Sequence, residues 1–138
     1  MIILDTNVIS EPLRAQANAG VISWLDAQDF DTLYLTSVSL AEVLTGVEIL
    51  PLGQRRSALE ARLTAVLSLF PPERVLPFDA ASARFFALLM ARAKAAGQAI
   101  GFADGQIAAI AGANGFAVAT RDVGPFVAAG VAVVNPWG

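Results

Sequence analysis

The sequence has 138 residues, 56% of them apolar and 15% charged, with a formal net charge of −3 at pH 7. This length fits a single domain over residues 1–138, and the acidic balance argues against a protein that holds duplex DNA by neutralising its phosphates. Neither cysteine nor histidine occurs, which excludes disulfides, thiolate or imidazole metal sites and histidine general bases, and leaves oxygen ligands suited to Mg²⁺ or Mn²⁺.

The predicted elements alternate between short apolar strands and helices. The first strand reads IILD and ends in Asp5, and the helices stop at proline or glycine residues such as Pro51 and Gly97. In chain order we expect a strand at 2–5, helices at 7–14 and 19–27, a strand at 33–36, helices at 37–50 and 54–69, a strand at 75–78, helices at 80–96 and 102–113, and strands at 117–120 and 131–134.

This alternation predicts the α/β class, as a three-layer α/β/α sandwich with a parallel sheet of about five strands. In open sheets of this kind, ligands bind in the crevice beyond the carboxyl ends of the strands. Residues that directly follow predicted strands are therefore candidates for a functional site.

No segment of the sequence is expected to enter a membrane. The most apolar window, residues 102–118, contains Asp104 and falls short of the roughly 20 apolar residues of a spanning helix. The N-terminus lacks the basic residues of a signal peptide. We therefore expect a cytoplasmic protein, and the high apolar content favours association, with a homodimer as the expected state.

Four carboxylates stand apart from the other acids. Most of the twelve Asp and Glu residues lie in polar loops, at helix caps or near arginines, where solvation or capping accounts for them. The exceptions are Asp5, Glu42, Asp104 and Asp122.

Asp104 and Glu42 lie in helices that offer them little polar surroundings. Asp104 falls in the apolar run FADGQIAAIA, where an unpaired buried carboxylate is unfavourable, although it could also be the N-cap of that helix. Glu42 has small neighbours three and four residues away, which leave room beside its carboxylate, and the alternative is an exposed glutamate. Asp5 ends the first predicted strand and Asp122 follows the fourth, so all four could converge on one crevice.

Such a carboxylate group fits a site for one or two divalent cations. Carboxylate-bound metals activate water and stabilise both oxygens of a phosphodiester under hydrolysis. Thr6, Asn7 and Thr120 could orient a ligand, a water or a phosphate oxygen. Thr6 and Asn7 are also residue types that cap a helix at a strand-to-helix corner.

The motifs LDTNVIS, SLAEVLTGV, FADGQIAAIA, TRD and VVNPW occur in this order along the chain. Together they resemble the PIN-domain ribonucleases, and more narrowly the FitB-like branch of the VapC toxins of type II toxin-antitoxin pairs. The resemblance covers essentially the whole chain. It implies a PIN domain with a metal site of Asp5, Glu42, Asp104 and Asp122, supported by Thr6, Asn7 and Thr120.

The resemblance also implies a function and partners. It predicts an endoribonuclease that uses Mg²⁺ or Mn²⁺ to cut single-stranded regions of tRNA, rRNA or mRNA. It further predicts a cognate antitoxin with a DNA-binding N-terminal region, so that DNA is contacted only through the antitoxin. One departure is that many VapC relatives have Asn at the position of Asp122 and Asp three residues later, where this chain has Pro125.

Two other functions remain open at this point. The chain could be mainly an interaction module in a toxin-antitoxin repressor complex. It could also be a phospho-acceptor domain with Asp5 as the acceptor, but that reading is disfavoured because Asn7 stands where a second Asp is required and the only lysine, Lys94, lies inside a helix.

Overall fold

The centre of the molecule is a sheet of five parallel strands in the order β3-β2-β1-β4-β5. The structure is a computed structural model that describes residues 1–138. Its strands are β1 (Ile2–Leu4), β2 (Leu33–Thr36), β3 (Val75–Leu76), β4 (Ala117–Ala119) and β5 (Val133–Val134). The chain runs outward from β1 to β3 and then returns to β4 beside β1, so the order reverses at the central pair of strands. This is the position where ligands bind in open α/β sheets.

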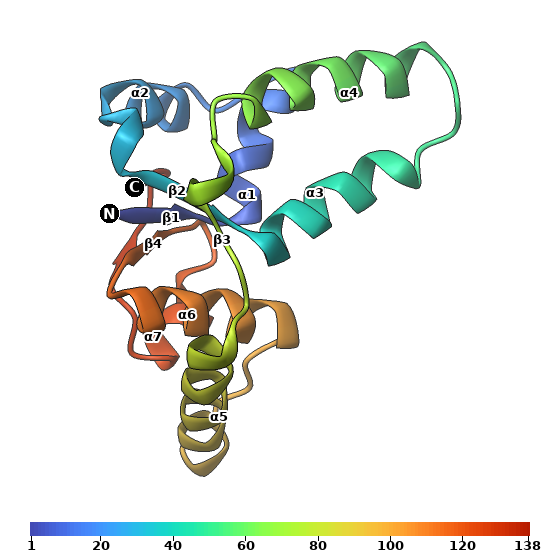
Figure 1. Ribbon diagram of the computed structural model, residues 1–138. Coiled ribbons are helices and arrows are strands. Elements are labelled where there is room, and N and C mark those ends of the chain that lie inside the picture. Colours follow the sequence, from blue (N-terminus) through green and yellow to red (C-terminus); the bar gives the residue numbers. More distant parts are fainter.

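Helices cover both faces of the sheet, as Figure 1 shows. One layer contains α1 (Thr6–Ser10), α2 (Ala19–Ala27) and α4 (Gln54–Leu67), and the other contains α5 (Ala80–Ala95), α6 (Phe102–Asn114) and α7 (Val123–Ala128). Helix α3 (Ser37–Glu48) continues from β2 beyond the edge of the body. The predicted three-layer α/β fold is therefore confirmed.

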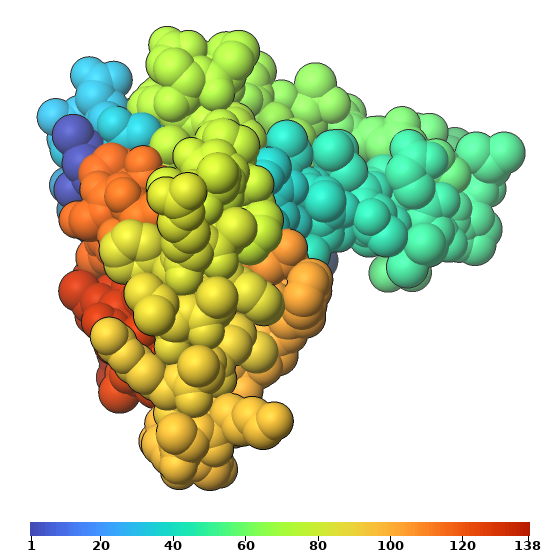
Figure 2. Space-filling model, turned by 60° about the horizontal axis from the view of Figure 1, so that its bottom comes forward, coloured from blue at the N-terminus to red at the C-terminus, as the bar shows by residue number.

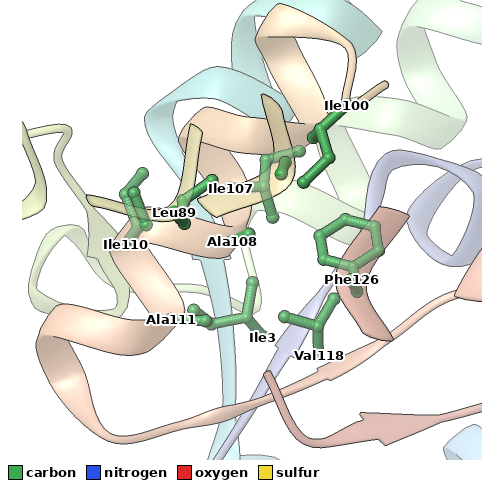
Figure 3. Packing of buried hydrophobic residues seen from close by; sticks show 11 residues of the cluster. Ile3, Leu89, Ile100, Ile107, Ala108, Ile110, Ala111, Val118 and Phe126 are labelled. Atoms are coloured by element: carbon green, nitrogen blue, oxygen red, sulfur yellow. The ribbon is translucent and has the colours of Figure 1, made fainter. Parts of the chain in front are cut away.

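The two apolar cores lie on opposite faces of the sheet because side chains alternate along each strand. Ile3 and Val118 belong to the core against α5, α6 and α7, whose packing is shown in Figure 3. Leu4 and Ala119, the next residues in the same strands, belong to the core on the other face. These four residues are almost fully buried, which fixes the two central strands between both layers.

Helices α3 and α4 form an arm that projects from the body, as Figure 2 shows for the segment coloured cyan to green. Leu63 is the one fully buried residue of α4, and Leu59, Val66 and Leu67 pack partly buried against the same core. None of the helices is long and apolar enough to cross a membrane.

The helix predicted at 7–14 is divided in the structure. Helix α1 ends at Ser10 and a 3-10 turn, η1 (Glu11–Leu13), follows it. Pro12 explains the change, because proline has no amide hydrogen to continue the α-helical bonding pattern.

One short helix, α7, is absent from the sequence prediction. Its sequence, VGPFVA, contains the two residues that usually break helices, Gly124 and Pro125. Both lie in the first turn, where a backbone N–H has no partner within the helix, so proline is tolerated there.

Candidate functional site

Asp5 lies at the carboxyl end of β1 and is held by two hydrogen bonds. Its Oδ1 accepts from the backbone N–H of Thr6 at 2.8 Å, which makes Asp5 the N-cap of α1. Its Oδ2 accepts from the hydroxyl of Thr120 at 2.7 Å. The side chain is 4% exposed, so both oxygens have fixed directions in a nearly dry setting.

Thr120 joins the segments that follow β1 and β4. Its fully buried hydroxyl donates to Asp5 and accepts from the backbone N–H of Asp122 at 3.0 Å and from Nδ2 of Asn7 at 3.4 Å. The amide oxygen of Asn7 accepts from the backbone N–H of Arg121 at 3.3 Å. A hydroxyl has one proton to donate and two lone pairs that accept, so the Thr120 hydroxyl forms every hydrogen bond that it can.

Glu42 reaches the same region from α3. That helix starts with Thr36, whose buried hydroxyl accepts from the backbone N–H of Ser39 at 3.0 Å. One and a half turns later, Glu42 accepts a hydrogen bond from the Thr6 hydroxyl at 2.9 Å through its Oε1. Glu42 is exposed, yet this bond ties it to the residue next to Asp5.

Asp104 lies in the first turn of α6 and is half-buried. The helix begins at Phe102 with Gly101 at the cap position, so the alternative of Asp104 as the N-cap is wrong. Burial raises the pKa of Asp104 above its usual value, and the negative charges of Asp122 and Glu42 raise it further.

Asp122 occupies the position before α7 but makes no capping bond with its side chain. It is exposed, so its carboxylate is available to a ligand. Its backbone N–H donates a hydrogen bond to the Thr120 hydroxyl, which fixes the position of the Asp122 backbone beside Asp5.

The four carboxylates influence one another electrostatically. Burial raises the pKa of Asp5 to about 6; hydrogen bonds from Thr120 and Thr6 oppose this change, while the charges of Asp104 and Glu42 add to it. Asp104 is therefore coupled to all three other acids. A cation placed among them would offset this repulsion.

The donor chemistry of the site fits Mg²⁺ or Mn²⁺, since every candidate ligand is a carboxylate oxygen. The side-chain positions fit less closely, because no group of three or more acidic side chains lies near enough together to hold one ion. The structure thus brings the predicted acids around the ends of β1 and β4 without gathering them into one ligand cluster. An ion held by three of these carboxylates therefore requires their side chains to move.

A groove of about 660 Å³ leads from Thr6 and Glu42 along the arm. Arginines line it, namely Arg14, Arg55 and Arg62. None of these three arginines is among the predicted site residues. The spacing of seven residues between Arg55 and Arg62, which places both on one helix face, is a signal that could have identified two of them.

Glu11 is a further residue near the groove that is absent from the predicted site. It is 3% exposed and accepts from the backbone N–H of Asn18 at 2.9 Å. Its carboxylate also pairs with Arg14 at 3.2 Å. The Asn18 N–H contributes most to lowering the pKa of Glu11, so this buried acid is ionised and holds the segment between η1 and α2.

Comparisons with known proteins agree with this architecture. Residues 2–130 match the PIN domain. The chain is 51% identical to plasmid stability protein StbB of Pseudomonas syringae pv. tomato, and the match covers 99% of each protein. It is 50% identical to VapC ribonuclease Y4jK of Sinorhizobium fredii, over 99% of this chain and 98% of the relative.

Solved structures show the same likeness. The crystal structure of FitAcB from Neisseria gonorrhoeae superimposes with a TM-score of 0.94 at 48% identity and covers 99% of both chains. The structure of FitAB bound to an IR36 DNA fragment gives a TM-score of 0.95 at 47% identity, over 100% of this chain and 96% of that one. The extent of the domain match and these identities show that the chain belongs to the PIN domain family.

Proposed function

We propose that this protein is the toxin of a type II toxin-antitoxin pair and acts as a metal-dependent endoribonuclease on single-stranded regions of RNA. The observation that carries the proposal is the whole-length identity of 50% to a protein named VapC ribonuclease. The placement of Asp5 and Thr120 at the point where the strand order reverses supports it. The proposal takes residues 1–138 as one PIN domain.

In this proposal, Asp5, Glu42, Asp104 and Asp122 hold Mg²⁺ or Mn²⁺. When bound, such an ion supplies a nucleophilic water and stabilises the charge that develops on the phosphate. Asp5 is mostly ionised at pH 7 because its pKa is about 6. It can therefore bind a cation without first losing a proton.

The polar neighbours act by positioning these carboxylates. The Thr120 hydroxyl and the Thr6 N–H fix the two oxygens of Asp5, and the Thr6 hydroxyl directs Glu42. Asn7 spans from α1 to Thr120 and Arg121, which keeps the segment after β4 beside the segment after β1. Supporting partners of this kind typically change metal affinity or activity by about 10- to 100-fold.

A cleavage assay tests the proposed activity. The purified protein should cut single-stranded RNA in Mg²⁺ or Mn²⁺ and not in EDTA. Asp5→Asn and Asp104→Asn should each reduce the rate by at least about 100-fold, because each removes a charged ligand. Asp31→Asn is the matched control, since Asp31 is exposed and lies before β2, at the opposite end of that strand from the site. Undiminished cleavage by both site variants would refute the assignment.

A second candidate function is that of an interaction module in a repressor complex. The structure of FitAB bound to DNA favours it, because that complex contains a chain 47% identical to this one. We propose a cognate antitoxin whose N-terminal region makes the DNA contacts. If the purified chain binds Mn²⁺ but cuts no RNA from its own host, while its complex with the antitoxin binds promoter DNA, this function is the main one.

A further inference from the structure

The groove along the arm opens onto the candidate site. It runs between α1, the segment after η1, α3 and α4, and Thr6 and Glu42 line it together with arginines of α4. Its volume of about 660 Å³ lies within the roughly 300–1,000 Å³ of pockets that bury one drug-sized ligand, so it can hold one or two nucleotide-sized groups. A strand that enters the site can therefore continue along this groove.

Two cations in the groove have no ionic partner. Arg55 and Arg62 of α4 are exposed and form no salt bridge. Arg56, next to them in sequence, behaves differently, because it pairs with Glu48 at 2.9 Å and with Glu60 at 2.8 Å. Arg14 is committed in part to Glu11.

The arrangement of the two free arginines is regular. They are seven residues apart, which is close to two helical turns, so they project from one face of α4 about 10 Å apart along its axis. Leu59, halfway between them, lines the same groove. Since α4 buries only Leu63, packing of the core does not account for either arginine.

We propose that Arg55 and Arg62 bind backbone phosphates of the RNA strand on one side of the cleavage position. This inference rests on the proposed ribonuclease function and specifies which surface holds the substrate. An arginine guanidinium matches a phosphate with two parallel hydrogen bonds, and Arg55 and Arg62 have no ionic partner that would compete with a phosphate. The negatively charged RNA backbone is repelled by the four carboxylates of the site. Positive charge close to the site offsets this repulsion.

Gly46 of α3 provides an independent way to probe the groove. It lines the groove, and a Cβ added to it meets no atom within 4 Å. A longer side chain there projects into open space and leaves the core unchanged. Gly46→Glu and Gly46→Gln add nearly the same volume and differ in charge.

The test measures binding and cleavage separately on the full chain. Binding uses a fluorescent single-stranded RNA in EDTA, which prevents metal-dependent cleavage, titrated over a range of KCl concentrations, and cleavage uses the same RNA with Mn²⁺. The variants are Arg55→Ala, Arg62→Ala, the double variant and the Gly46 pair. Arg92→Ala is the matched control, because Arg92 is an exposed arginine on α5, outside the groove.

Each single arginine variant should weaken binding about tenfold or more, and the double variant should raise KM with little change in kcat. The slope of log binding constant against log salt concentration should fall by about 1.4 in the double variant, because each single-strand phosphate contact contributes about 0.7. Gly46→Glu should weaken binding more than Gly46→Gln does. Arg92→Ala should behave as the wild type.

Equal RNA affinity and equal salt dependence in the wild type and the double variant would overturn the proposal. It would also fail if the double variant kept RNA binding and lost only its binding to the antitoxin, since the groove would then be a protein-binding surface. A third outcome is that the wild type binds RNA without cutting it and the double variant does not bind RNA. The ribonuclease function would then be refuted, and the assignment of the groove to RNA would be supported.

Discussion

At the scale of single residues, burial and repulsion between carboxylates make the ionised form of Asp5 unfavourable. Asp5 is buried, ionised at neutral pH and close to two further acids. Its hydrogen bonds to Thr6 and Thr120 relieve only part of this, because burial remains the larger influence on its pKa. Asp5 also caps α1, but a buried and ionised carboxylate in this position is what the proposed metal site requires.

The coupling between acids leads to a prediction for Asp104→Asn. Asp104 raises the pKa of Asp5, so removal of its charge should bring that pKa down from about 6. Carbon-13 NMR titration of the Asp side-chain carboxyl groups, in EDTA, measures the change. Asp31→Asn should leave the pKa of Asp5 where it is, and an unchanged value in Asp104→Asn would show that the two groups are not coupled.

Asp5→Asn should make the protein more stable at neutral pH. The pKa of Asp5 rises from 3.8 to about 6 on folding, which corresponds to about 3 kcal/mol lost from the free energy of unfolding when the group is ionised. The folded wild type takes up this proton as the pH falls through 6, so its stability recovers there, whereas the variant has no such group.

Urea unfolding in EDTA at pH 8 and pH 5 measures this difference. The advantage of the variant should shrink by about 1.4 kcal/mol at pH 5, one unit below the folded pKa. An advantage that is the same at both pH values, or no advantage at pH 8, would contradict the pKa assigned to Asp5.

At the scale of elements, the sequence predicts the order of strands and helices well, and the errors have local causes. The helix Ala19–Ala27 and the strand Leu33–Thr36 have the predicted bounds. An apolar run defines each of them, and the residues that end it are its neighbours in the sequence. The division after Ser10 and the helix α7 depend on where a proline falls within a turn, which a periodic pattern does not reveal.

The site was predictable only where the order of the strands determines the position of a residue. Asp5 and Asp122 follow strands, so their location is a consequence of the topology. The bond from Thr6 to Glu42 and the arginines of the groove depend on how α3 and α4 sit against α1, which is a matter of tertiary packing. No local pattern contains that information.

Two glycines in helices should respond in opposite directions to substitution. A Cβ on Gly46 meets nothing within 4 Å, so Gly46→Ala should raise the free energy of unfolding by about 1 kcal/mol through helix propensity. A Cβ on Gly105 would lie 3.0 Å from Phe86 and 3.1 Å from Met90, so Gly105→Val should lower it by about 1 to 3 kcal/mol. Urea unfolding at pH 8 measures both, and a destabilised Gly46→Ala would contradict this account of α3.

At the scale of the whole molecule, apolar surface remains exposed on the layer that contains α5 and α6. Phe85 is 44% exposed, Leu88 57% and Phe102 69%. Large apolar side chains left exposed on one layer are typical of a surface that another chain covers. We therefore propose a homodimer, with this surface in contact between the copies.

Light scattering coupled to gel filtration tests the dimer. The wild type should elute with twice the mass of its 14.4 kDa chain, and Leu88→Arg should shift it to a monomer with an unchanged circular dichroism spectrum. Lys94→Ala should leave the mass unchanged, because Lys94 is exposed on the same helix but lies on a different face from Phe85 and Leu88. A monomeric wild type, or a dimer that Leu88→Arg does not affect, would show that this surface is not the interface.

Our central proposal is that four separate segments of the chain, around the ends of β1 and β4, supply carboxylates that bind a metal. Crystals of the protein soaked with Mn²⁺ test this most directly, by anomalous diffraction at the manganese edge. We predict manganese within about 2 to 2.5 Å of oxygens from at least three of Asp5, Glu42, Asp104 and Asp122, and no such peak in Asp104→Asn. Manganese bound only elsewhere in the wild type, or an unchanged peak in Asp104→Asn, would contradict the account.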